Sequence, residues 1–145
     1  KVQLKLLLVG NGVLEDQLVQ QALNDPNILF IAFQNQSQMP VVYRLGNVLC
    51  LPSAGPGETC GLAINEAMAS GLPVIVSARV GCAPDLVQMG KTGFIFSTDQ
   101  EDALMTILHQ LSSSDLKAMG HQAKTSIEDW SFEQQMAAII HQLHD

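Results

Sequence analysis

Short apolar runs alternate with helix-forming segments along the chain, and this alternation limits the possible folds more than any other feature. The runs are LKLLLVG (4–10), ILFIAF (28–33), NVLCLP (47–52), PVIVS (73–77) and GFIFS (93–97). Strands that are apolar throughout are typical of parallel sheets, which helices cover on both faces. The sequence therefore predicts an α/β fold in which a parallel sheet lies buried between two layers of helices.

Ligands of such sheets bind beyond the carboxyl ends of the strands. That rule selects the loops GNG (10–12), PSAGPGE (52–58) and SARVGCAPD (77–85). After the second loop we expect a helix that begins near Gly61 and ends before Gly71, with Pro73 just beyond. The N–H groups of Cys60, Gly61 and Leu62 would have no partner within this helix, and Gly61 has no side chain to keep an oxygen-rich group from the backbone. The sequence predicts a phosphate site there.

Two carboxylates flank this predicted phosphate site, Glu58 just before the helix and Glu66 about one turn inside it. A carboxylate repels phosphate, but its two oxygens accept hydrogen bonds from hydroxyl groups and suit a vicinal diol. A ligand with phosphates at the helix tip and hydroxyls on either side, such as a nucleotide sugar, would use both glutamates. The alternative is purely structural, because acidic residues stabilise helix N-termini in any case.

The composition excludes several classes of partner. The chain has 145 residues, which suits one domain, and 14 acidic against 7 basic residues give it a net charge of −7. Without a cluster of Lys and Arg, neither nucleic acid nor an anionic membrane is expected as a partner. No apolar run approaches the ~20 residues of a membrane span. The three cysteines form no CxxC motif, which favours reduced thiols in the cytoplasm.

The segment GETCGLAINEAMASGLPVIVS (57–77), followed by ARVGCAPDLV (78–87) and GKTGFIF (90–96), closely resembles the nucleotide-binding domain of retaining GT-B glycosyltransferases of the family 4, group 1 type. That family has two glutamates separated by seven residues, matched here by Glu58 and Glu66. Its Gly-x-Gly turn matches residues 10–12, its P-N-V-x-F-x-G-F segment resembles PNILFIAF (26–33), and its aromatic segment before the last helix resembles WSFE (130–133). The resemblance covers nearly the whole chain.

This resemblance implies a Rossmann-like three-layer parallel sheet and a role for each matching residue. Glu58, the candidate catalytic residue, would bind hydroxyls of the donor sugar, and Glu66 would bind the ribose diol. The backbone of Cys60, Gly61 and Leu62 would hold the sugar and the diphosphate. The remaining donor contacts would come from Gly10 and Gly12, beside the donor, and from the backbone at Gln34 or Asn35, which would face the base. The donor would be a nucleotide sugar such as a UDP- or GDP-sugar, and no metal ion or other cofactor is expected.

The chain departs from the family pattern in two respects. Cys60 stands where the family often has Phe or Trp, which leaves the donor's identity open. The family domain also begins with a strand ending in Gly-Arg and a Lys-Gly segment, which neutralise the diphosphate, and an acceptor-binding N-terminal domain precedes it. We therefore expect residues 1–145 to be a donor-binding, C-terminal domain fragment that lacks the first strand–helix unit and the N-terminal domain. Any peripheral membrane contact would come from that missing domain.

In the family's strand order, 3-2-1-4-5-6, the missing strand would be central. We therefore predict that the strands at 4–10 and 47–52 either pair directly or leave an interrupted sheet. We also expect the fragment alone to be inactive. Two other functions stay open at this point: a module that binds a nucleotide or nucleotide sugar without transferring it, and a nucleotide-sugar epimerase of related fold.

A capping box, a loop arginine and a pair of histidines give three smaller predictions. Thr98 and Glu101 have the spacing of a capping box, which predicts a helix beginning after Thr98. Arg79 is either a solvated loop residue or a phosphate ligand. His141 and His144 lie three apart on the last helix without a third ligand, so no metal site is predicted.

Overall fold

The computed structural model describes residues 4–55 and 57–144. Residues 1–3, Pro56 in the second predicted ligand loop and Asp145 lie outside this range. The chain divides into two compact units, one ending at Val42 and the other beginning at Tyr43.

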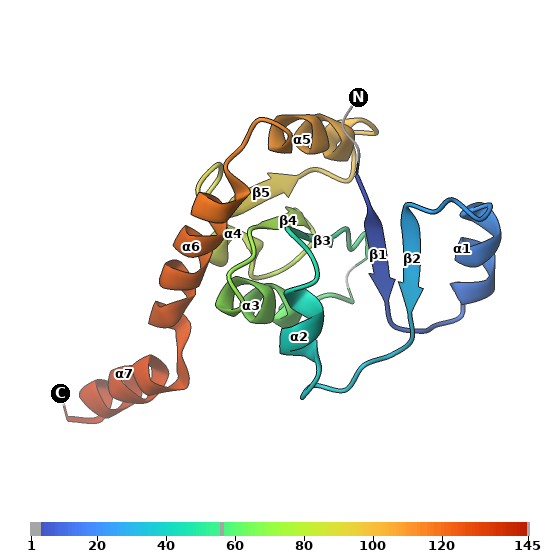
Figure 1. Cartoon of the computed structure of the whole chain (residues 1–145). Coiled ribbons are helices and arrows are strands. Elements are labelled where there is room, and N and C mark those ends of the chain that lie inside the picture. The colour runs from blue at the N-terminus through green and yellow to red at the C-terminus, as the bar shows by residue number, and fades with distance from the viewer. Residues whose placement is uncertain (1–3, 56, 145) are drawn as a thin grey trace. The chain divides into compact units, whose positions relative to one another are not determined.

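The first unit contains a two-stranded parallel sheet, β1 (Leu6–Val9) and β2 (Ile28–Ile31), paired from Leu6 with Ile28 to Val9 with Ile31. Helix α1 (Glu15–Gln21) connects the strands and lies beside β2 (Figure 1). The expectation that both strands are buried is wrong for the described residues, since Leu6 is 47% and Leu29 50% exposed. One seven-residue helix cannot cover both faces of a sheet. Helix α2 (Met39–Tyr43) then leads into the second unit.

The second unit is built on a three-stranded parallel sheet in the order β3–β4–β5. Its strands are β3 (Leu49–Leu51), β4 (Val74–Ser77) and β5 (Gly93–Phe96). Its helices are α3 (Leu62–Ala69), α4 (Ala83–Leu86), α5 (Ala103–Leu111), α6 (Leu116–Ile127), the 3-10 turn η1 (Glu128–Trp130) and α7 (Phe132–His144). The predicted α/β class with parallel strands is confirmed. Each sheet is described within its own unit, so the predicted relation between the strands at 4–10 and 47–52 stays a prediction.

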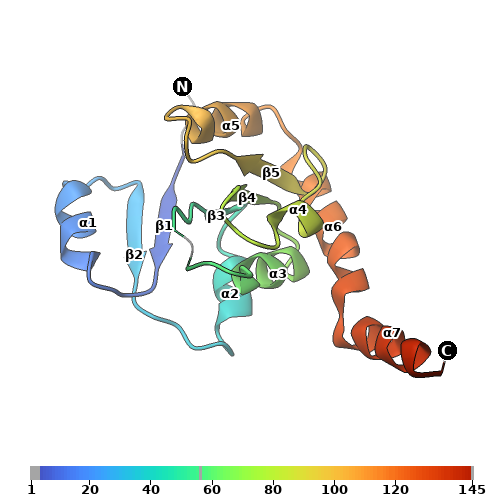
Figure 2. The ribbon, with the colours of Figure 1, turned by 180° about the vertical axis from the view of Figure 1, so that it is seen from behind.

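Helices cover both faces of the β3–β4–β5 sheet, with α5 on one side and α3 on the other (Figures 1 and 2). All four residues of the central strand β4 are buried, as its apolar sequence predicts. Ile75 packs with Phe96, Ile107 and Leu111 on the α5 side. On the other side the buried face of α3, which includes Ile64 and Met68, contacts β3 and β4. The second unit therefore has the layered core that the sequence predicts.

The last two helices differ in how they are covered. Helix α6 packs against α3, and Asp115 caps it by accepting a hydrogen bond from the Ala118 N–H at 3.0 Å. Helix α7 leads away from the sheet (Figure 1), and its apolar residues remain exposed, with Phe132 at 82% and Leu143 at 77%.

The capping box predicted at Thr98 and Glu101 is wrong. Helix α5 begins at Ala103, with Asp102 as its N-cap residue. The Thr98 hydroxyl instead accepts a hydrogen bond from Arg79 Nε at 3.3 Å, and the Arg79 guanidinium pairs with Asp99 at 3.2 Å. The loop after β5 is therefore tied to the loop after β4, and this contact replaces the expected cap.

Candidate functional site

The site is built around the N-terminus of α3. The helix begins at Leu62 and ends at Ala69, and Gly71 lies in the left-handed region two residues beyond its end, as the sequence predicts. Gly61 is the N-cap residue and has φ +88°, a backbone conformation that favours glycine. The N–H groups of Cys60, Gly61 and Leu62 donate to no atom of the described residues. The helix therefore presents unpaired donors at the positive end of its dipole.

Gly61 is required for a reason that the sequence does not reveal. A Cβ built on this residue would lie 2.6 Å from Val80 Cγ1, 3.2 Å from Ile64 Cδ1 and 3.3 Å from Cys82 Sγ. Val80 and Ile64 are buried, so the missing side chain leaves room for the core. The structure thus explains Gly61 by its φ and its packing, and approach of a ligand to this backbone stays a prediction.

The loop after β4 supports the loop that carries Glu58. The buried Ser77 hydroxyl donates a hydrogen bond to the carbonyl oxygen of Ser53, just past the end of β3. Further along, the Cys82 N–H donates to the Cys60 carbonyl oxygen at 3.3 Å. These bonds connect the loops that follow β3 and β4, at the edge of a parallel sheet where ligands usually bind.

Gly81 brings the two loops still closer together. A Cβ on Gly81 would lie 2.0 Å from the Thr59 carbonyl oxygen, so only glycine permits this approach. The sequence predicts that the loop after β4 lies on the ligand side of the sheet, but it predicts no role for Gly81 or Cys82. A glycine in this loop could have indicated a close approach of two backbone segments, but the sequence does not show that the other segment is at Thr59. Burial raises the pKa of the Cys82 thiol, and Cys60 raises it further, so this sulfur is neutral near pH 7.

Glu66 accepts a hydrogen bond from Tyr43, a residue for which the sequence predicts no role in the site. The Tyr43 hydroxyl donates a hydrogen bond to Glu66 Oε2 at 2.8 Å. Tyr43 is only 7% exposed, and burial together with the neighbouring Glu66 raises the pKa of its phenol well above the ordinary value of about 10. The phenol is therefore a permanent donor to this carboxylate. No sequence signal links the two residues, because they lie on different helices.

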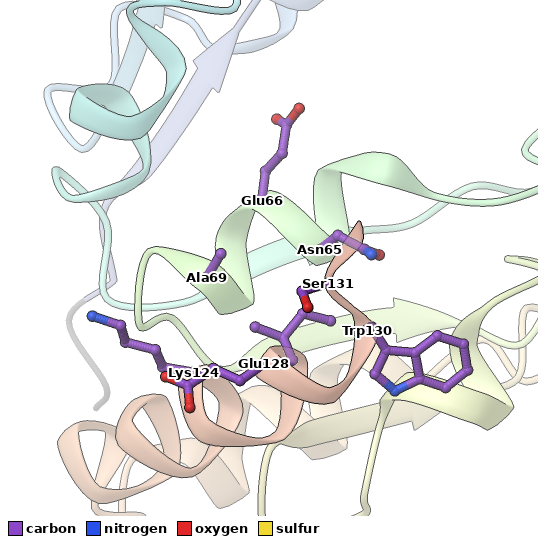
Figure 3. A pocket seen from close by; sticks show the side chains of 8 residues that line it. Asn65, Glu66, Ala69, Lys124, Glu128, Trp130 and Ser131 are labelled. Atoms are coloured by element: carbon purple, nitrogen blue, oxygen red, sulfur yellow. The ribbon is translucent and has the colours of Figure 1, made fainter. Parts of the chain in front are cut away.

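A cavity of about 390 Å³ lies on another side of α3, between this helix, the end of α6 and η1. Its lining includes Asn65, Glu66, Lys124, Glu128 and Trp130. Figure 3 shows the Glu66 carboxylate pointing away from Lys124, Glu128 and Trp130. Of the predicted site residues only Glu66 lines this cavity, so the cavity is distinct from the helix N-terminus.

The remaining predicted donor residues lie in the first unit. The Gly10 N–H donates to the Ile31 carbonyl oxygen at 2.9 Å, and a Cβ on either Gly10 or Gly12 would meet open space. The Gln34 side chain donates to the Ala32 carbonyl oxygen at 3.0 Å. The structure thus places Glu58, Cys60, Gly61, Leu62 and Glu66 in the second unit and Gly10, Gly12 and Gln34 in the first, and the donor-binding roles of all eight residues stay predictions.

In the part of the chain that the structure describes, no three His, Cys, Asp or Glu side chains are grouped so as to hold a metal ion. In that same part, no helix has both the length and the apolar character needed to cross a membrane.

Comparison with known proteins gives a consistent result. Residues 1–126 match the family described as glycosyl transferases group 1. The chain is 34% identical over 133 residues to the sulfoquinovosyl transferase SQD2 of Arabidopsis thaliana, covering 87% of this chain and 25% of that protein. It is 31% identical over 134 residues to the N-acetyl-alpha-D-glucosaminyl L-malate synthase of Bacillus anthracis, covering 88% and 33%. The chain thus spans a quarter to a third of the length of these relatives.

Solved structures share the fold. The structure of Anabaena HepE in complex with UDP-glucose superposes with a TM-score of 0.77 at 22% identity, covering 98% of this chain and 42% of that one. The sucrose-phosphate synthase of Thermosynechococcus elongatus superposes with a TM-score of 0.73 at 24% identity, covering 97% and 38%.

Proposed function

The chain belongs to the group 1 glycosyltransferase family, and on that premise we propose that residues 1–145 are the donor-binding, C-terminal domain of a retaining glycosyltransferase of the family 4 type. The full-length enzyme would transfer a sugar from a UDP- or GDP-sugar to an acceptor held by a separate N-terminal domain. The three cysteines are free thiols, which supports a reducing compartment such as the cytoplasm.

The observation that carries this proposal is the arrangement at the start of α3. The N–H groups of residues 60–62, which have no partner among residues 4–55 and 57–144, stand at a helix N-terminus, with the partly buried carboxylates of Glu58 and Glu66 on either side in the sequence. When the bond between the sugar and the diphosphate breaks, its electron pair leaves with the diphosphate, and negative charge increases on the phosphate oxygens. Backbone donors fixed in advance at that position stabilise this charge without a metal ion.

The two glutamates have separate proposed roles. Glu58 precedes the helix and would accept hydrogen bonds from hydroxyls of the donor sugar, which orients the carbon that is attacked. Glu66, one turn inside the helix, would accept the hydrogen bonds of the ribose diol. Gly10, Gly12 and the backbone at Gln34 are the remaining proposed donor contacts, on the ground of the family resemblance.

The first experiment is a calorimetric titration of the chain with UDP, GDP, UDP-glucose and GDP-mannose. We expect saturable binding of one base series, weakened about tenfold or more by Glu66→Gln, because hydrogen bonds to a charged group are worth about 1.5–3 kcal/mol. Glu133→Gln, which changes an exposed glutamate on α7, is the matched control and should bind like the parent chain.

Sugar transfer must be measured on the full-length protein. There Glu58→Gln should reduce transfer while nucleoside diphosphate binding persists, and the product should keep the anomeric configuration of the donor. Residues 1–145 alone should transfer no sugar. Transfer by this fragment, or binding that Glu66→Gln leaves unchanged, would contradict these assignments.

A further inference from the structure

We propose that Tyr43 is a positioning residue for nucleotide recognition, which fixes the carboxylate of Glu66 in the orientation that receives the ribose diol. This inference rests on the proposed donor site and adds to it a residue that does not itself contact the ligand. Tyr43 and Glu66 are 23 residues apart in sequence and lie at the end of α2 and in the middle of α3.

Packing and a backbone hydrogen bond hold Tyr43 in place. The ring is 7% exposed, so packing fixes its position. The backbone of Tyr43 is also held, since its carbonyl oxygen accepts the Gly46 N–H at 3.1 Å. The hydroxyl lies 2.8 Å from Glu66 Oε2, an ordinary length for a hydrogen bond between oxygens. A rigid donor thus holds one oxygen of a flexible side chain.

The direction of this hydrogen bond is also fixed. A carboxylate only accepts hydrogen bonds, so the phenol must donate its single proton to Glu66. The raised pKa of Tyr43 keeps that proton in place throughout the physiological range. The hydroxyl is therefore satisfied by Glu66, and it cannot serve the ligand as a donor at the same time.

The consequence for a ligand follows from the acceptor capacity of Glu66. A carboxylate offers about four lone-pair positions, and Tyr43 occupies one of them, on Oε2. Oε1 and the remaining position on Oε2 stay open for the two hydroxyls of a vicinal diol. Without the phenol the side chain would have to lose rotational freedom on binding, which weakens affinity. Only ligands that carry the diol should bind with this reduced affinity.

The test compares UDP with its 2′,3′-dideoxy analogue, or the corresponding GDP pair if the guanine series binds. Titrations would use the chain itself, Tyr43→Phe, Glu66→Gln and the double variant. Tyr43→Phe should weaken UDP binding about two- to tenfold, the usual range for one hydrogen bond, and change dideoxy-UDP binding less than about twofold. Glu66→Gln should abolish the preference for the diol, and adding Tyr43→Phe should then cost nothing more.

The outcomes separate this inference from the proposed function. If Glu66→Gln removes the preference for the diol but Tyr43→Phe does not reduce it, the positioning role is refuted and the donor site stands. Equal losses for both ligands in Tyr43→Phe also refute it, because they indicate a general structural effect. If no nucleoside diphosphate binds, or Glu66→Gln leaves the preference intact, the assignment of Glu66 fails and the inference fails with it.

A second measurement decides the matter if Tyr43→Phe does not fold. Tyr43 is the only tyrosine among these 145 residues, so ¹³C-labelled tyrosine gives a single set of ring signals. Addition of UDP should shift the signal of the ring carbon that carries the hydroxyl, and dideoxy-UDP should shift it much less. Equal shifts with both ligands would overturn the proposal.

Discussion

Replacing Gly61 by alanine should destabilise the chain more than replacing Gly71, although both glycines lie in the left-handed region beside the same helix. Their φ values are +88° and +82°, so alanine meets similar backbone strain at both positions. A Cβ on Gly71 would have no neighbour within 4 Å, whereas on Gly61 it would lie 2.6 Å from Val80 Cγ1. The pair therefore separates backbone strain from steric overlap.

The expected magnitudes follow from these two contributions. The left-handed conformation costs a residue with a Cβ about 1–2 kcal/mol, which is the expected loss of unfolding free energy for Gly71→Ala. Gly61→Ala should lose this amount and a further 1–3 kcal/mol or so, the usual cost of overpacking a core. Val80 is 1% exposed and has little room to move away, which favours the upper part of that range.

Urea denaturation at fixed pH measures both losses, and a double-mutant cycle checks the cause. If overlap with Val80 is responsible, Val80→Ala should cost clearly less in the Gly61→Ala chain than in the parent chain. Gly61→Ala should also weaken nucleotide binding, because the helix N-terminus must shift, whereas Gly71→Ala should not. Equal destabilisation by the two alanines, or additive effects of Gly61→Ala and Val80→Ala, would refute the packing argument.

Three further predictions follow. The raised pKa of Tyr43 contributes stability that is fully present below about pH 10 and is lost as the pH rises further, because only the unfolded chain then ionises. In chemical denaturation from pH 9 to 11, the free energy of unfolding should fall more steeply than in Tyr43→Phe, by up to about 1.4 kcal/mol per pH unit, and parallel curves would count against the burial of the phenol beside Glu66. Ile75→Ala, at a fully buried position of β4, should cost about 2–5 kcal/mol by urea denaturation, against less than about 0.5 kcal/mol for Val41→Ala, which is 59% exposed. Asp99→Asn should change stability by only about 0–1 kcal/mol, and less in high salt, since its ion pair with Arg79 is exposed; a larger, salt-independent effect would be inconsistent with this geometry.

The sequence predicted structure best where the residues that determine an element all lie within one short segment. Helix α3 begins beside Gly61 and ends before Gly71, as the glycines and Pro73 predict, because capping and termination depend on a few neighbouring residues. The fully buried strand β4 was equally clear from its continuous apolar run. The family resemblance is confirmed by the family match over residues 1–126, while the roles of the two glutamates in the E-x7-E spacing stay predictions.

Predictions failed where the partner of a residue was distant in the sequence. The hydroxyl of Thr98 was expected to cap the helix that follows it, but it accepts a hydrogen bond from Arg79 instead. The apolar strands β1 and β2 were expected to be buried, yet an apolar pattern shows only that a face can be buried and not that a layer exists to cover it.

The sequence by itself therefore determined the class of fold, the order of strands and helices, the family, and the segment that carries Glu58 and Glu66. Only the tertiary structure showed why Gly61 and Gly81 must be glycine and which residue holds Glu66. The physical reason is that periodicity, capping and turn chemistry act over a few residues. The Gly61–Val80, Gly81–Thr59 and Tyr43–Glu66 contacts exist only after the sheet and its helices have packed.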